Sequence, residues 1–274
     1  MQKRFFIIAG ILILILFIGF FIGQFFKDPS NQGDWPLIYQ KIPEVEFNGN
    51  LALIKNIRNF RYDEKENVIS PDYYDKVYNL SKVKKVWFIF EPFGYAAHTF
   101  LSFEFENNDY LTISIEARTE KHQKYEAFTG LLRSYSLFYV VADEHDAFLV
   151  RTNIRKNKVI LFPSSLTKEQ GSALLVDMLI EINDLKENPK WYNTATANCT
   201  SVLAKHINRF RAQSLPFSWE LIFTGFVDDL AYNSGLIKTS LVLRQAKTYY
   251  DITEKSRKIG DNPDYSLLIR HGFE

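Results

Sequence analysis

The sequence predicts an α+β domain, in which an antiparallel sheet packs on helices, preceded by one N-terminal transmembrane helix. Three observations carry this prediction. Two runs that alternate between apolar and polar residues, 97–105 and 110–117, flank a turn cluster and are typical of a β-hairpin. Apolar residues recur at helical intervals after Thr167. The run 5–26 holds 22 residues without a charge, and about 20 apolar residues cross a bilayer as a helix.

The charges beside the uncharged run predict its orientation. Lys3 and Arg4 precede it, and positive flanks stay in the cytoplasm, so the chain after it is expected on the far side of the membrane. A cleaved signal peptide is the alternative, but such peptides have apolar cores of about 7–15 residues. We therefore expect an uncleaved anchor at 1–27, a stalk containing several prolines and glycines at 28–50, and the main domain at 51–274.

Composition narrows the class of partner. Nucleic-acid-binding domains are usually strongly basic, whereas this chain has a net charge of only +1. We therefore expect no nucleic acid as a binding partner. With 46% hydrophobic residues and 24 phenylalanines, the chain after the stalk can bury one sizeable core. The sequence has no His-x-x-x-His or Cys-x-x-Cys pattern and no glycine-rich phosphate loop. We expect neither a metal nor a cofactor.

The elements before and in the hairpin follow from local signals. Ser70 can cap a helix and Pro71 suits its first position, which predicts a helix over 70–80. The apolar run 86–90 predicts a buried strand. In the hairpin that follows, each arm has one apolar face and one more polar face, and His98 lies on the polar face of the first arm.

The second half of the chain is expected to be largely helical. Thr167 and Gln170 have the spacing of a capping box, which predicts a helix from there to Pro189. Asn198 can cap another helix. The remaining expected elements are a helix at 120–134, strands at 137–142 and 159–162, and a helix at 218–233. The last 30 residues are polar and show no clear pattern.

Cys199 is the only cysteine in the chain. In an oxidising compartment it cannot form an internal disulfide, so it is either a buried small side chain or a nucleophile. If Asn198 caps a helix, Cys199 lies in the first turn, where unpaired N–H groups favour the thiolate that attacks carbonyl carbons. Both interpretations remain open on this evidence alone.

A thiol nucleophile needs a base, and His98 is the best candidate among the five histidines. In a tight hairpin the cross-strand neighbours of His98 fall near 116–118. We therefore expect Glu116 to orient the ring, with Ser114 as the weaker choice. His206 lies ~10 Å along the helix from Cys199, too far to act as base. His122 and His145 lie among charges and are expected to be solvated, and His271 lies in the tail.

Six linked motifs in this order resemble the Lnb N-terminal periplasmic domain family of Gram-negative bacteria. The resemblance covers about 56–211. The matching segments are 57–62, 73–81, 97–103, 113–118, 139–144 and 192–200, the last with Tyr192-Asn193-Thr194 and Asn198-Cys199-Thr200. Two positions depart from the family pattern: His145 stands where an arginine is expected, and Ala197 where a second asparagine is expected.

The resemblance implies a permuted papain-like fold of the NlpC/P60 type, in which the base histidine precedes the nucleophilic cysteine. Together with the uncharged run and its positive flank, it places a periplasmic domain on a single-pass inner-membrane anchor with a cytoplasmic N-terminus. Some members of the family are lipoprotein N-acyltransferases. By resemblance, the nucleophile is Cys199 and the base is His98, and the hairpin adds Glu116 as the third catalytic residue. The expected partners are a phospholipid acyl donor and a lipoprotein acceptor.

We therefore expect ping-pong acyl transfer through a thioester on Cys199. Two alternatives stay open. A cysteine amidase or endopeptidase acting on peptidoglycan would share the nucleophile and transfer the acyl group to water. A non-catalytic anchored binding module would merely pack Cys199 in its core.

Overall fold

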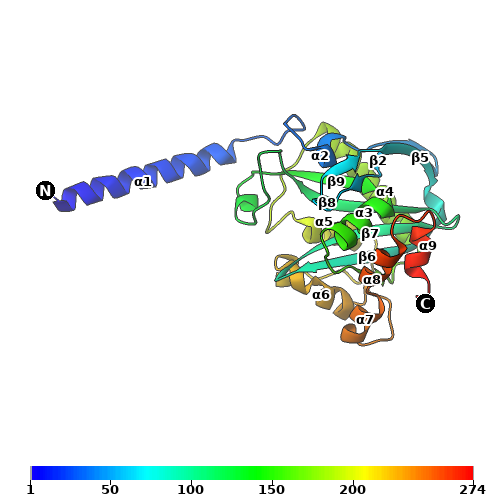
Figure 1. The fold of residues 1–274 in the computed structure, drawn as a ribbon. Coiled ribbons are helices and arrows are strands. Elements are labelled where there is room, and N and C mark those ends of the chain that lie inside the picture. Colours follow the sequence, from blue (N-terminus) through cyan, green and yellow to red (C-terminus); the bar gives the residue numbers. More distant parts are fainter. Residues whose placement is uncertain (1, 274) are drawn as a thin grey trace.

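The computed structural model describes residues 2–273 and is built around one eight-stranded, mostly antiparallel sheet. Its strand order is β1-β2-β9-β8-β7-β6-β10, with β5 paired to β2. Figure 1 shows the sheet at the centre of the domain. The strands are β1 (Glu44–Asn48), β2 (Leu51–Arg58), β5 (Tyr73–Asn79), β6 (Val83–Phe93), β7 (Ala96–Phe105), β8 (Tyr110–Arg118), β9 (Ser136–Ala142) and β10 (Ile160–Pro163); β3 (Arg61–Tyr62) and β4 (Val68–Ser70) form a small second sheet.

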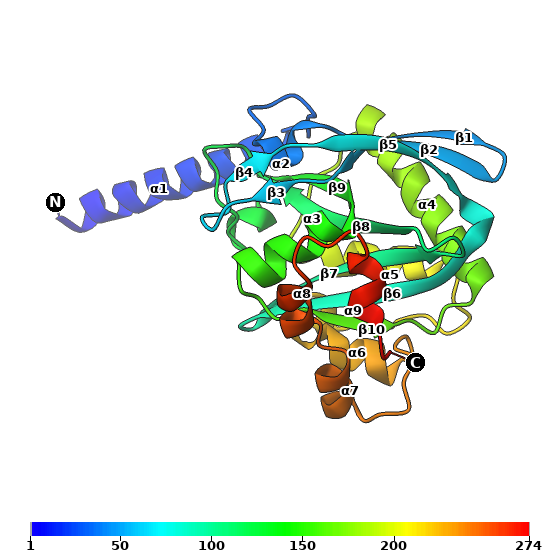
Figure 2. The same cartoon turned by 45° about the vertical axis from the view of Figure 1, so that its right-hand side comes forward.

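Helices cover both faces of this sheet (Figures 1 and 2). One apolar cluster joins the sheet to α4 (Lys168–Glu187) and α5 (Cys199–Asn208), and a second joins it to α3 (Glu144–Leu149), α8 (Thr253–Ile259) and α9 (Tyr265–Arg270). The other helical segments are α1 (Gln2–Phe25), α2 (Leu37–Gln40), α6 (Val227–Asn233), α7 (Leu243–Tyr249), a π-helix at Val150–Ile154 and 3₁₀ turns at Leu80–Lys82, Thr129–Leu131, Trp219–Leu221 and Thr224–Phe226.

The side chains of β6 point alternately to the two faces of the sheet, and both faces are buried. Phe88 and Phe90 belong to the cluster beneath α4 and α5, whereas Trp87 and Ile89 belong to the cluster on the opposite side. Successive side chains of a strand point to opposite faces, so a strand that is apolar throughout needs cover on both. The α+β class with a mostly antiparallel sheet packed on helices is confirmed.

The hairpin and the two capped helices are confirmed. β7 and β8 pair antiparallel, with Phe100 opposite Ser114. At the start of α4, Thr167 and Gln170 form the expected capping box. The strands predicted at 86–90, 137–142 and 159–162 are also present, within β6, β9 and β10.

The helix predicted over 70–80 is wrong, because this segment is strand β5. Its aromatic and β-branched residues suit a strand, and β2 offers a partner edge on which Leu51 pairs with Asn79 and Arg58 with Tyr73. Pairing with a distant segment has overridden the local Ser70-Pro71 signal, which instead marks the turn between β4 and β5.

The helix predicted over 120–134 is also wrong, and only a 3₁₀ turn at Thr129–Leu131 forms there. The Tyr135 hydroxyl holds this segment as a loop: it accepts from the N–H of Glu126 (3.0 Å) and donates to the carbonyl of Lys124 (2.9 Å). Gly130 also packs so closely that a Cβ there would lie 2.3 Å from Thr194 Oγ1.

The two ends of the domain differ from expectation as well. The segment 28–50, expected to be a stalk, includes β1, which pairs with β2 in the main sheet. In 218–233 only α6 and two 3₁₀ turns form instead of one helix. The final residues form α7, α8 and α9, and buried side chains such as Tyr265 and Ile269 complete the second apolar cluster.

The uncharged run 5–26 lies mostly in α1, which extends away from the domain in Figures 1 and 2. The side chains of many α1 residues fall outside the described part of the structure. Among the described residues, no helix is both long and apolar enough to span a membrane.

Candidate active site

Cys199 is the first residue of α5, as the cap at Asn198 predicted. The Asn198 side chain accepts from the N–H of Ser201 (2.8 Å), and the Ser201 hydroxyl accepts from the N–H of Asn198 (3.0 Å). The Asn198 amide also donates to the carbonyls of Thr194 (2.7 Å) and Leu221 (2.8 Å). These bonds fix the start of the helix, and the thiol that it carries is 7% exposed.

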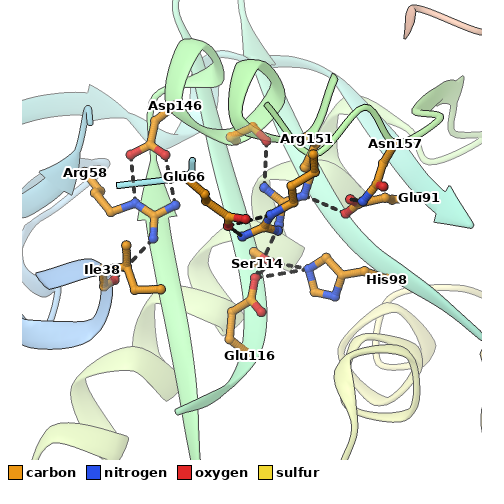
Figure 3. A network of polar contacts seen from close by, with 12 residues as sticks. Ile38, Arg58, Glu66, Glu91, His98, Ser114, Glu116, Asp146, Arg151 and Asn157 are labelled. Atoms are coloured by element: carbon orange, nitrogen blue, oxygen red, sulfur yellow. Dashed lines mark hydrogen bonds and ion pairs between the residues drawn. The ribbon is translucent and has the colours of Figure 1, made fainter. Parts of the chain in front are cut away.

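His98 lies on β7 with its ring oriented by two groups on β8 (Figure 3). Nε2 is 2.6 Å from Ser114 Oγ and 3.2 Å from Glu116 Oε1, and the Ser114 hydroxyl donates to Glu116 (2.7 Å). A hydroxyl that donates to the carboxylate accepts from Nε2–H, so Nδ1 is left for the thiol. Glu116 and Ser114, considered as alternatives from the sequence, therefore both contact the ring. Phe100 stacks on that ring at 5.5 Å between centroids.

Arg151 and Glu91 extend this network and were missed by the sequence reasoning. Arg151 donates through Nε to Glu91 (2.7 Å) and through Nη2 to Glu116 (3.4 Å), while Asn157 donates to Glu91 (2.6 Å). Figure 3 shows these side chains converging beside His98. Glu91 could have been found, because the β6–β7 register places it opposite His98. Arg151 gave no such signal, since it lies in the π-helix and contacts residues far away in the chain.

The pKa shifts of Cys199 and His98 favour a thiolate–imidazolium pair. Burial would raise the pKa of the Cys199 thiol, but the charge of His98, a hydrogen bond with His98 and the N–H of Thr99 together lower it. For His98, burial would lower the pKa, whereas the Glu116 carboxylate and then the Cys199 thiolate raise it to about 10. The sulfur is nucleophilic in this charge state.

Glu116 is held in its charged form despite its burial. Burial alone would raise the pKa of this carboxyl, but the charges of His98 and Arg151 and the hydrogen bond from Ser114 bring it well below its usual range. A carboxylate that stays charged beside His98 stabilises the imidazolium. Glu116 thus contributes electrostatically as well as by orienting the ring.

The three predicted site residues line one cavity of about 640 Å³. Its polar wall includes Glu91, Glu116 and Arg151. Its other walls are largely apolar or aromatic, with Tyr39, Phe93, Tyr95, Ala97, Ile115, Tyr125, Tyr192, Ile222 and Phe223 among the lining residues. The arrangement brings a nucleophile, a base and a carboxylate to a space large enough for an extended apolar chain and a polar group.

The other histidines lie away from this centre. His206 is buried, with the Tyr139 hydroxyl 2.6 Å from Nε2 and Asp177 2.6 Å from Nδ1, so it packs in the interior. His122 is exposed, as expected. His145 was expected to be solvated, which is wrong: its side chain is 14% exposed and contacts the Asn262 carbonyl at 2.6 Å. Among the described residues, no group of three or more metal-binding side chains is assembled.

A family model described as the Lnb N-terminal periplasmic domain matches residues 70–225, more than half of the chain. The matched region contains His98, Glu116 and Cys199 together with Glu91 and Arg151. No curated protein and no solved structure matches the chain.

Proposed function

Since the chain belongs to the Lnb N-terminal periplasmic domain family, we propose that it is a membrane-anchored cysteine acyltransferase whose domain faces the periplasm. The observation that carries the proposal is the coupling of Cys199 to His98 inside a cavity with mostly apolar walls. A buried thiol that served only for packing would have no reason to lie against a histidine held by Ser114 and Glu116.

The first half-reaction would load the enzyme. The Cys199 thiolate attacks the carbonyl carbon of a phospholipid ester and forms a tetrahedral oxyanion. As the C–O bond breaks, His98 gives its proton to the leaving alkoxide. A lysophospholipid departs with a free hydroxyl, and the acyl chain remains on sulfur as a thioester.

The second half-reaction would transfer the chain. The N-terminal amine of a lipid-modified cysteine in a lipoprotein attacks the thioester carbonyl. His98, now neutral, takes a proton from the amine as the C–S bond breaks, so an amide forms and the imidazolium–thiolate pair is restored. Backbone N–H groups in the first turn of α5 would stabilise the oxyanion in both steps.

The apolar walls support transfer rather than hydrolysis. Water competes with the amine for the thioester, so a transferase must keep water out until the acceptor binds. Ile115, Ile222 and Phe223 line the cavity with side chains that offer water no hydrogen-bond partner. A peptidoglycan amidase would instead need an open polar cleft for glycan and peptide.

Anchoring by α1 is part of the proposal. The helix covers most of the uncharged run, with Lys3 and Arg4 at its start, so a single pass with the N-terminus in the cytoplasm would carry the domain to the periplasmic side. We also propose that the fold is a permuted papain-like one, since His98 on a strand precedes Cys199 at a helix start.

The test supplies both substrates. The full chain in phospholipid vesicles, mixed with a diacylated lipopeptide that has a free N-terminal amine, should yield an N-acylated lipopeptide and an equal amount of lysophospholipid. The Cys199→Ala variant should yield neither. Cleavage of a peptidoglycan peptide, with no lipid product from either substrate, would move the assignment to the amidase.

A further inference from the structure

We propose that the aromatic rim of the cavity rests on the periplasmic surface of the lipid bilayer, so that the cavity opens into the membrane interface. The aromatic rim consists of Phe93, Tyr95, Trp219, Ile222, Phe223 and Phe226, which are 37% to 85% exposed. The inference rests on the proposed anchoring by α1 and names the surface on which the site would operate.

The rim is one continuous surface made from two segments that are distant in the sequence. The turn between β6 and β7 supplies Phe93 and Tyr95, and the segment 219–226 supplies the other four. The N–H of Ala97 donates to Thr224 Oγ1 (2.9 Å), and the two backbones approach so closely that a Cβ at Gly225 would lie 2.5 Å from the Tyr95 carbonyl oxygen.

Rings within the rim also contact one another while remaining exposed. The Trp219 ring lies 5.1 Å from that of Phe226 and 6.3 Å from that of Phe223, measured between centroids. Exposed apolar side chains that are scattered over a surface are ordinary, whereas a cluster of them in one place indicates an interaction surface. Aromatic side chains of this kind, Trp and Tyr in particular, are enriched where membrane proteins meet the lipid headgroups.

The rim and the cavity are continuous. Phe93, Tyr95, Ile222 and Phe223 line the same cavity as Cys199. A lipid ester at the interface could therefore reach the thiol while its acyl chain remained against apolar side chains. A bilayer seated on the rim would also cover the open side of the cavity and exclude bulk water.

The end of α1 favours the bilayer over other occupants. The carbonyl of Lys27, just after the uncharged run, accepts from Trp191 Nε1 at 3.2 Å, and the next residue, Tyr192, lines the cavity. In both Figure 1 and Figure 2, the β6–β7 turn lies on the side of the domain from which α1 departs. A membrane spanned by α1 would thus face the rim.

The experiment locates single nitroxide labels relative to lipid. Phe223→Cys and Tyr95→Cys would each be made in a Cys199→Ala background, labelled, and inserted as the full chain into vesicles of phosphatidylethanolamine and phosphatidylglycerol. The matched control is Leu267→Cys on α9, a comparably exposed apolar residue at 44%, at the end of the domain away from α1 in Figure 1. Collision with oxygen, which concentrates in lipid, is compared with collision with a water-soluble nickel chelate.

We expect the ratio of oxygen to nickel collisions to be several-fold higher at both rim positions than at the control. Equal ratios at all three would overturn the proposal. Rim labels that lie in water and become immobilised only when a diacylated lipopeptide is added would also overturn it. The same holds for rim labels that show spin–spin coupling to a second copy of the chain. The Cys199→Ala variant lacks the proposed nucleophile, so the position of the labels is measured independently of the proposed acyl transfer. Vesicle flotation tests the anchor separately. Protein that does not float with the vesicles would overturn both the anchoring by α1 and the contact of the aromatic rim with the bilayer.

Discussion

At the scale of single residues, the reactivity of Cys199 depends on a chain of charges. Arg151 contacts Glu116, Glu116 contacts His98, and His98 lowers the pKa of the thiol. Burial opposes the ionisation of Glu116, His98 and Cys199 and would shift the pKa of each toward its neutral form. The charged forms are favoured because opposite charges alternate along the chain, so removing any one member weakens the electrostatic stabilisation of its neighbours.

Cys199→Ala and His98→Ala should each abolish acyl transfer, by about four orders of magnitude or more, because a nucleophile and its base act as one unit. Glu116→Gln should cost less, on the order of 100-fold, because the amide keeps an acceptor oxygen while losing the charge that shifts the histidine pKa. Steady-state turnover on vesicles would measure these losses. His122→Ala is the matched control, since its side chain is 70% exposed. Near-normal turnover by a folded Cys199→Ala variant would exclude Cys199 as the nucleophile of an enzyme.

The pH dependence of alkylation should report the lowered pKa of Cys199. Iodoacetamide reacts with the thiolate, so the rate rises as the pH passes upward through the thiol pKa. In the wild type this midpoint should lie below the usual thiol value, because His98 lowers the pKa. In His98→Ala the lowering charge is gone while burial remains, so the midpoint should move upward. Identical midpoints in the two proteins would show that the pair is not coupled.

At the scale of elements, the cap of α5 should contribute to both stability and catalysis. Asn198→Ala removes the capping box, which costs about 0.5–2 kcal/mol, and also two bonds to the carbonyls of Thr194 and Leu221. Thr167→Ala on α4 is the matched control, because it removes an exposed capping box of the same kind. Urea unfolding should show the larger loss for Asn198→Ala. Activity of the folded protein should fall only in that variant, and equal activity in both would refute the role of the cap in positioning Cys199.

Elements that depend on local signals could be predicted from the sequence, whereas those that depend on distant partners could not. The helices begun by Thr167 and Asn198 carry their caps within four residues. β5 exists because β2 pairs with it, and 120–134 is a loop because Tyr135 and Thr194 hold it. No local pattern contains those partners.

The site shows the same division. The predicted hairpin places the neighbours of His98 near 116–118, a range in which Glu116 is the carboxylate, and the cap places Cys199 at a helix start. These three residues could therefore be found from the sequence. Arg151 reaches the site from a π-helix that follows β9 and α3. Its role depends on a packing arrangement that only the fold provides.

At the scale of the whole molecule, the segment between α1 and the folded domain is shorter than expected. β1 pairs in the main sheet, and Asn31 already donates to the carbonyl of Leu185 at 2.9 Å. Few residues therefore separate the end of α1 from the folded domain. If α1 anchors the chain, the proposed active site would be held at a nearly fixed height above the membrane, which suits the proposed reaction between a phospholipid and a lipoprotein.

The proposed orientation of the chain rests on Lys3 and Arg4, which precede the uncharged run. An alkaline phosphatase fused after Glu274 should be active, because that enzyme folds only outside the cytoplasm, and the protein should remain in the membrane pellet after a high-salt wash. Fusion to a reporter that works only in the cytoplasm serves as the opposite control. Activity of the cytoplasmic reporter alone would contradict a periplasmic domain.

The central claim is that Cys199 carries an acyl chain between two substrates, and intact-mass spectrometry with the donor alone tests it most directly. Only the second half-reaction needs the amine, so the full chain incubated with phospholipid and no acceptor should gain the mass of one acyl group. Hydroxylamine should release that group, and the Cys199→Ala variant should gain nothing. The account would be contradicted if the wild-type protein acylated lipopeptide but never showed this adduct. It would also be contradicted if the Cys199→Ala variant gained the same mass.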